Sequence, residues 1–114
     1  MKHIHEFYET EHYSYFITSA GDVYRYNKIR GTILPMKCST ADGHYKLIVL
    51  ENGKKFWYAH RLVYEAFVGE IPEGLVVDHI DNDYTNNRVW NLQVITKSEN
   101  TQKYYDWQKS LEEA

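Results

Sequence analysis

The stretch Val77-Asp78-His79-Ile80-Asp81 is the most informative part of this sequence for both fold and chemistry, because an apolar run ends there in an acid–histidine pair. Side-chain amides follow at intervals: Asn86-Asn87, then Asn91 twelve residues after His79, then Asn100 nine residues after Asn91. Asp78 and Asn100 offer oxygen atoms of the kind that bind hard divalent cations. If the stretch is a strand, His79 points to the face opposite Asp78 and is available as a base. A hydrolase that cuts a phosphodiester with one metal ion needs this set of groups.

The residues around this stretch predict a strand, a long polar loop, a second strand and a helix. The strands are expected over Leu75–Ile80 and Leu92–Thr96, with the loop between them. Thr96-Lys97-Ser98-Glu99 has the spacing of a helix N-terminal capping box. The helix should therefore run from about Lys97 through Trp107 and be followed by an acidic tail.

The first half of the chain predicts mainly strands, rich in β-branched and aromatic residues. They are expected over Tyr13–Thr18, Val23–Tyr26, His44–Leu50 and Lys54–Ala59, with a polar loop around Ser39–Gly43. Asn52-Gly53 suits a tight hairpin turn between the last two strands. Apolar residues at helical spacing then predict a short amphipathic helix over His60–Phe67, which Gly69 and Pro72 end.

Length and composition set limits on the class of protein. The 114 residues suffice for one small domain or two lobes that share a core, and 43% of them are hydrophobic. The formal net charge of −3 argues against a pure DNA-binding module but suits a site that concentrates acid to hold a metal. The single cysteine, Cys38, excludes an internal disulfide and a thiolate zinc cluster. No apolar run has the roughly 20 residues needed to span a bilayer, and no signal peptide is apparent.

Together these motifs resemble those of the HNH endonuclease family, in the form whose last motif position is Asn. The resemblance covers about Ala59–Gln102. It implies an α+β fold in which a small antiparallel β lobe precedes a ββα-metal (His-Me finger) nuclease core. The expected division is 1–57 for the β lobe and 58–114 for the core. Segments such as Phe16-Ile17-Thr18 and Gly43-His44-Tyr45 resemble the β module that precedes many homing-type HNH domains.

The resemblance also implies roles for the motif residues. His79 would be the general base that activates water, and Asp78 and Asn100 would be the metal ligands. Asn91 would hold the loop between the strands and help to orient the base. Asn86 and Asn87 occupy the position of the paired amides typical of this loop, where a structural role is at least as good an explanation.

Two departures from the family bear on the metal. Many members carry a second histidine one turn beyond the last motif position, where this chain has Tyr104, and many hold a structural zinc with paired Cys-x-x-Cys. The remaining ligands are hard oxygens, which favour Mg²⁺ over zinc, with Mn²⁺ as the second choice. No structural zinc is expected.

Seven residues are candidates for DNA contacts. They are Lys54 and Lys55 at the predicted hairpin, His60 and Arg61 at the helix start, and Arg88, Lys97 and Lys103 around the motif. Two have ordinary alternatives, since His60 could simply cap or pack and Arg61 could simply be solvated. Trp90, Trp107 and Tyr104-Tyr105 are expected in the core or at an interface, and the remaining histidines on the surface or in a sheet.

The sequence therefore predicts a metal-dependent HNH endonuclease of phage or mobile-element type that acts on double-stranded DNA. With one site per monomer it should nick one strand at a time, although a homodimer is equally compatible with the chain. It is expected to be cytoplasmic, with no membrane partner. The alternatives are a catalytically inactive module that binds nucleic acid or protein, and an RNase that uses the same site.

Overall fold

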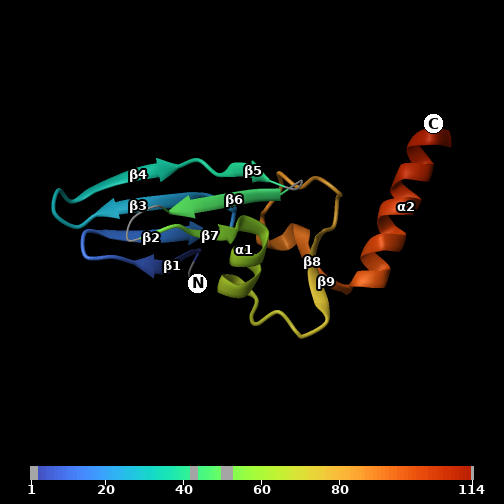
Figure 1. Ribbon diagram of the computed structural model, residues 1–114, viewed down its shortest axis with the longest axis horizontal. Helices are drawn as coiled ribbons and strands as arrows, with labels where there is room; N and C mark the ends of the chain where they lie inside the picture. The colour runs from blue at the N-terminus through green and yellow to red at the C-terminus, as the bar shows by residue number, and fades with distance from the viewer. Residues whose placement is uncertain (1–2, 42–43, 50–52, 114) are drawn as a thin grey trace.

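The computed structural model describes residues 3–41, 44–49 and 53–113, and Figure 1 shows their arrangement. Three antiparallel sheets follow one another along the chain, and two helices join or extend them. The fold is thus α+β, as the sequence predicts.

The first sheet contains four strands in sequence order. They are β1 (Ile4–Glu9), β2 (Tyr13–Thr18), β3 (Val23–Asn27) and β4 (Thr32–Met36). Because side chains alternate between the faces of a strand, the facing pair Ile17 and Val23 buries one face of the sheet. The other face carries Phe16 and Tyr24, which are only partly buried.

The second sheet contains β5 (Ser39–Ala41), β6 (His44–Val49) and β7 (Lys55–Tyr58). Strands β6 and β7 are antiparallel neighbours, and the predicted Asn52-Gly53 turn between them falls partly outside the described residues. The chain then passes directly into α1 (Ala59–Phe67), whose buried side chains include Leu62 and Val63 on one face.

The third sheet and the second helix carry the motif. The strands β8 (Leu75–His79) and β9 (Leu92–Thr96) pair with Asp78 opposite Gln93, and the short 3₁₀ helix η1 (Val89–Asn91) precedes β9. The helix α2 (Lys97–Glu113) follows. The capping box forms as predicted, because the Glu99 N–H donates to Thr96 Oγ1 and the Thr96 N–H donates to Glu99 Oε1.

One hydrophobic core draws on both halves of the chain. It contains Ile17, Val23 and Leu47 from the first two sheets and Leu62, Val63, Val77 and Leu92 from α1 and the third sheet. Helix α1 lies between the N-terminal strands and β8–β9 and contacts strands of all three sheets (Figure 1). The expected boundary at residue 57 therefore separates two parts that share one core.

Several elements differ from their predicted form. Strands β1 and β4 occur where none was predicted, and β5 occupies part of the expected polar loop. Helix α2 continues to Glu113, beyond Trp107, through the supposed acidic tail. The reason is that hairpin pairing organises short strands of weak pattern, and charged residues are good helix formers.

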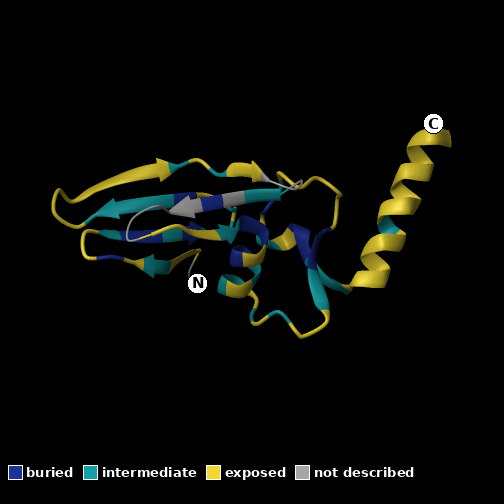
Figure 2. Ribbon diagram, in the orientation of Figure 1, coloured by how far each residue is buried: buried dark blue, intermediate teal, exposed yellow. Residues whose placement is uncertain are grey.

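The aromatic residues of the last third were expected in the core or at an interface, and within this chain the core assignment is wrong. Trp90 is 67% exposed and Tyr105 60% exposed. Helix α2 has no buried residue within its described length and extends away from the body of the molecule (Figure 2). Within the described part of the chain, neither helix has the length and apolar character needed to cross a membrane.

Candidate active site

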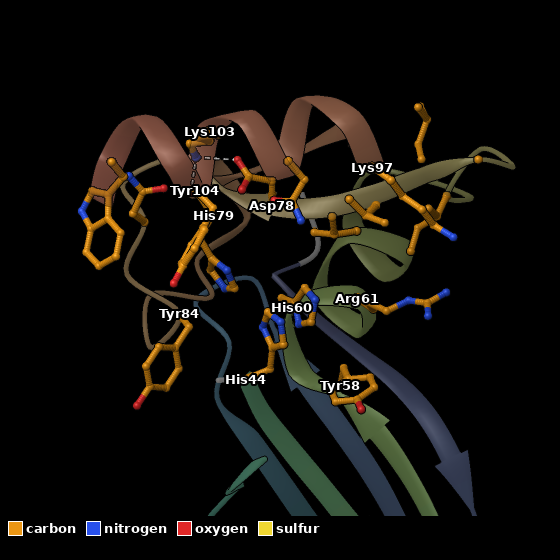
Figure 3. A pocket seen from close by; sticks show the side chains of 18 residues that line it. His44, Tyr58, His60, Arg61, Asp78, His79, Tyr84, Lys97, Lys103 and Tyr104 are labelled. Atoms are coloured by element: carbon orange, nitrogen blue, oxygen red, sulfur yellow. Dashed lines mark hydrogen bonds and ion pairs between the residues drawn. The ribbon is translucent and has the colours of Figure 1, made fainter. Parts of the chain in front are cut away.

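Three motif residues, Asp78, His79 and Asn100, line a cleft of about 840 Å³ between the three-stranded sheet, α1, β8 and α2, whereas Asn91 lies outside its lining. Asp78 and His79 reach it from the end of β8 (Figure 3). Asn100 lines it from the first turns of α2. Asp78 and His79 are buried and Asn100 is exposed. Residues 21 positions apart in sequence thus line one cavity.

The imidazole of His79 is oriented by Asn87. The distance between His79 Nε2 and Asn87 Oδ1 is 2.6 Å, and both residues are buried. Because an amide oxygen can only accept, Nε2 of a neutral ring must carry the proton and donate it. The lone pair then lies on Nδ1, which leaves that atom able to take a proton from water.

The carboxylate of Asp78 is held by one of its two oxygens. Gln93 Nε2 donates to Oδ2 across the β8–β9 pair at 2.9 Å, and Lys103 Nζ donates to the same oxygen at 2.6 Å. Among the described residues none donates to Oδ1. The side chain is therefore fixed in direction while one oxygen keeps its full capacity to accept.

The donors at this cleft fit a hard divalent cation. Asp78 Oδ1 and the amide oxygen of Asn100 are the ligand atoms that Mg²⁺ or Mn²⁺ prefers, with water or phosphate as further ligands. Asn100 also lies near the N-terminus of α2, where the helix dipole favours a phosphate group. Among the described residues there is no group of three or more His, Cys, Asp or Glu side chains that could hold a metal ion.

The loop between β8 and β9 is organised around Asn91. Its Nδ2 donates to Asp81 Oδ1 and to the backbone carbonyl of Asn86, each at 2.9 Å, and its Oδ1 accepts from the Asp81 N–H. Asn86 adds a bond to the other carboxylate oxygen of Asp81. The hydrogen bond from Asn86, followed by those from the Asp83 N–H and from Asn91, lowers the pKa of Asp81 to about 2. The side chain of Asn91 thus contacts the loop, whereas contact with the base comes from Asn87.

Three histidines gather beside the cleft (Figure 3). The ring of His60 lies 4.4 Å from that of His44 and 5.2 Å from that of His79, measured between centroids. His60 is buried, and its Nδ1 has no hydrogen-bond partner among the described residues. Burial, reinforced by His44, His79 and Arg61, lowers the pKa of His60 to about 3. His60 is therefore a neutral ring packed against the candidate base.

The predicted DNA-contact residues divide into two sets. His60, Arg61, Lys97 and Lys103 line the cleft. Lys54, Lys55 and Arg88 are exposed and do not line the cleft. The Nζ atom of Lys55 lies 5.5 Å from the ring centroid of Tyr8, and Arg88 donates a hydrogen bond to Asn86 Oδ1.

Three residues near the site carried no recognisable signal in the sequence. Gln93 was simply a strand residue, and His44 had no neighbouring constellation. Gly21, in the turn between β2 and β3, approaches Asn87 so closely that a Cβ at Gly21 would lie 2.8 Å from Asn87 Cβ. Of the three, only His44 is of a residue type that commonly takes part in catalysis, so it alone could have been a candidate site residue.

Comparison with known proteins identifies the class. The family model described as HNH endonuclease matches residues 57–102, which contain α1, β8, the loop, β9 and the start of α2. This part of the chain is an HNH endonuclease domain.

Relatives of the chain come from Bacillus and its phages. The SPbeta prophage-derived HNH homing endonuclease YosQ of Bacillus subtilis (strain 168) is 43% identical over 51 residues, which are 45% of this chain and 30% of that protein. The DNA endonuclease I-HmuI of Bacillus phage SP01 is 34% identical over 89 residues, 77% of this chain and 49% of that protein. The chain thus spans at most about half the length of either relative.

A solved structure extends the likeness to the N-terminal strands. It concerns DNA binding and cleavage by the HNH homing endonuclease I-HmuI, and it superposes with a TM-score of 0.64 at 31% identity. The match covers 81% of this chain and 52% of that one. The α+β architecture is therefore shared well beyond the HNH motif.

Proposed function

We propose that this chain is a metal-dependent DNA endonuclease that nicks one strand at each visit. The observation that carries the proposal is the convergence of Asp78, His79 and Asn100 on one cleft. The phage and prophage origin of the similar proteins supports a mobile-element setting, with double-stranded DNA as substrate in the cytoplasm of the host cell.

In the proposed mechanism, Nδ1 of His79 accepts a proton from the water that attacks the phosphorus. Asn87 holds the ring in the tautomer that makes this transfer possible. The bond from phosphorus to one sugar oxygen breaks, and the departing oxygen takes a proton from solvent. A divalent ion, Mg²⁺ before Mn²⁺, would be held by Asp78 and Asn100 and would supply Lewis-acid neutralisation of the phosphate charge. Asn91 keeps the loop, and with it Asn86 and Asp81, in place.

The other residues of the cleft would bind the substrate. Arg61 and Lys97 offer positive charge at its rim. The strands of residues 1–57, together with Lys54 and Lys55, would form a separate surface for the DNA backbone. Because those contacts are electrostatic, their contribution should weaken as the salt concentration rises.

Supercoiled plasmid tests this function directly. Incubation with the protein and Mg²⁺ should convert it to the nicked circle before any linear product accumulates, and EDTA should abolish the conversion. Nicking that continues in EDTA would refute the metal dependence. Binding of plasmid without any cleavage in Mg²⁺ or Mn²⁺ would instead support the inactive binding module, and cleavage of RNA alone would support the RNase.

A further inference from the structure

Lys103 connects α2 to the candidate active site. It lies three residues after Asn100, on the same side of the helix, and it is the only described residue of α2 that is not exposed. Its ammonium group donates to Asp78 Oδ2 at 2.6 Å and to the backbone carbonyls of His79 at 2.7 Å and Ile80 at 3.3 Å. All three donors of the ammonium group therefore have an acceptor.

This arrangement puts a positive charge on the same carboxylate that the proposed function assigns to a divalent ion. The Asp78 side chain is only 9% exposed and that of Lys103 27%, so water screens the pair weakly. An ammonium group and a divalent ion that share one carboxylate repel each other strongly at such short range. Lys103 must then oppose metal binding for as long as it stays on Asp78.

We propose that Lys103 exchanges partners during the reaction: it is the counter-ion of Asp78 in the free protein and contacts the DNA phosphate once metal and DNA are bound. This inference rests on the proposed function. The ammonium group already lines the cleft beside Asn100, where the phosphate is expected. A phosphate oxygen offers a charge-assisted bond equivalent to the one that Lys103 gives up.

The exchange makes metal binding and DNA binding depend on each other. With DNA absent, Lys103 has no alternative anion and weakens the affinity of Asp78 for the metal. With DNA present, the phosphate accepts the ammonium group, and the metal binds more tightly. By linkage, metal must strengthen DNA binding by the same factor. Lys103 would thereby make metal loading more favourable in the complex with substrate than in the free protein.

A purely structural role predicts the opposite effect on metal affinity. If Lys103 only docked α2 against β8, a neutral residue would loosen the helix that carries Asn100 and would weaken metal binding. Under the exchange proposed here, a neutral residue at position 103 removes a competitor of the metal and therefore strengthens metal binding. The sign of the change separates the two roles.

The decisive measurement is the Mn²⁺ dissociation constant of the full chain without DNA, determined from the electron paramagnetic resonance signal of free Mn²⁺. Lys103→Met should bind Mn²⁺ about tenfold more tightly than the wild type, within the usual range of coupling between sites. Lys109→Met removes one charge from the exposed end of the same helix and should match the wild type. An unchanged or weaker affinity for Lys103→Met would overturn the proposal.

The coupling to DNA is measured in the same way with a short duplex, in a His79→Ala background in which cleavage is too slow to matter during the measurement. The duplex should increase Mn²⁺ affinity less in the Lys103→Met protein than in the protein that retains Lys103. Equal increases in the two proteins would also contradict the exchange.

A second measurement uses the wild-type chain and does not depend on the folding of a variant. Lysine acylation is quantified by peptide mass spectrometry with and without Mg²⁺. Mg²⁺ at a concentration that saturates the DNA-free site, despite the competition from Lys103, should increase the acylation of Lys103 several-fold by freeing it from Asp78, and it should leave Lys109 unchanged. If Lys103 reacts equally in both conditions, the ammonium group stays in place and the exchange does not occur.

Failure of the exchange can be told apart from failure of the proposed function. A protein that nicks plasmid in Mg²⁺ and binds Mn²⁺, yet shows no effect at Lys103, keeps its function and loses only the exchange. A protein that neither binds Mn²⁺ nor nicks plasmid loses both.

Discussion

At the scale of single residues, the candidate base acquires its chemistry from one neighbour. His79→Ala should lower the plasmid nicking rate by about 10²–10⁴-fold, the usual contribution of a positioned base. Asn87→Ala should lower it by a smaller factor, because the ring remains but loses the 2.6 Å contact that sets its tautomer. Single-turnover nicking at saturating protein measures both rates. His12→Ala, at an exposed site outside the cleft, is the control, and a His79→Ala protein as fast as this control would refute the assignment.

His60 should make the stability of the protein sensitive to pH. Below about pH 6.5 the unfolded chain binds a proton at this ring, whereas the folded protein does so only near pH 3. Between these values the unfolded state holds more protons, so acidification favours unfolding by up to about 1.4 kcal/mol per pH unit. This stability is fully present above about pH 6.5 and is lost progressively as the pH falls.

Urea unfolding at a series of pH values tests this prediction. Between about pH 6.5 and pH 4, the wild type should lose more stability than His60→Phe, which keeps an aromatic ring and cannot be protonated. His12→Phe should follow the wild type. Parallel curves for the wild type and His60→Phe would mean that the buried ring is not kept neutral.

At the scale of elements, the loop between β8 and β9 depends on Asn91. Asn91→Ala removes three hydrogen bonds of a buried side chain and leaves the Asn86 carbonyl and Asp81 without these partners. We expect a loss of about 1–3 kcal/mol in the free energy of unfolding, measured by denaturant titration. The exposed Asn100 is the matched control, since Asn100→Ala should leave stability unchanged and alter only the metal requirement. A stable Asn91→Ala protein with an altered metal requirement would exchange the two roles.

At the scale of the whole molecule, the N-terminal sheet supports the candidate active site. The turn between β2 and β3 contacts the loop, because the Val89 N–H donates to the Ser19 carbonyl and Gly21 lies against Asn87. Gly21 also has φ +91°, a conformation that other residues adopt only with strain. A side chain here would strain the turn and displace Asn87 from His79.

Gly53 provides a matched control for this long-range effect. It has φ +99° and no atom within 4 Å of an added Cβ. Both Gly21→Ala and Gly53→Ala should lose stability, on the order of 1–3 kcal/mol, from backbone strain. Only Gly21→Ala should also lower the nicking rate, measured at a temperature where both proteins are folded. Equal rates for the two variants would show that the turn does not support Asn87.

The elements whose signals are local could be predicted from the amino-acid sequence. The capping box of Thr96 and Glu99 depends on residues three positions apart, and the strand and helix patterns of β2, β9 and α1 depend on neighbours within a few residues. The motif of Asp78, His79, Asn91 and Asn100 resembles that of HNH endonucleases, and the model of that family matches residues 57–102.

The groups that surround these residues could not be predicted, because they come together only in the folded chain. Asn87, rather than Asn91, reaches His79, while Gln93 and Lys103 reach Asp78, and His44 stacks on His60. Each of these contacts joins residues from different elements, or from different points of one loop. Their distances depend on how the sheets and helices pack around the shared core of Ile17, Leu47 and Val63. Local propensities carry no information about that packing, because it is set by burial of apolar surface between segments far apart in the chain.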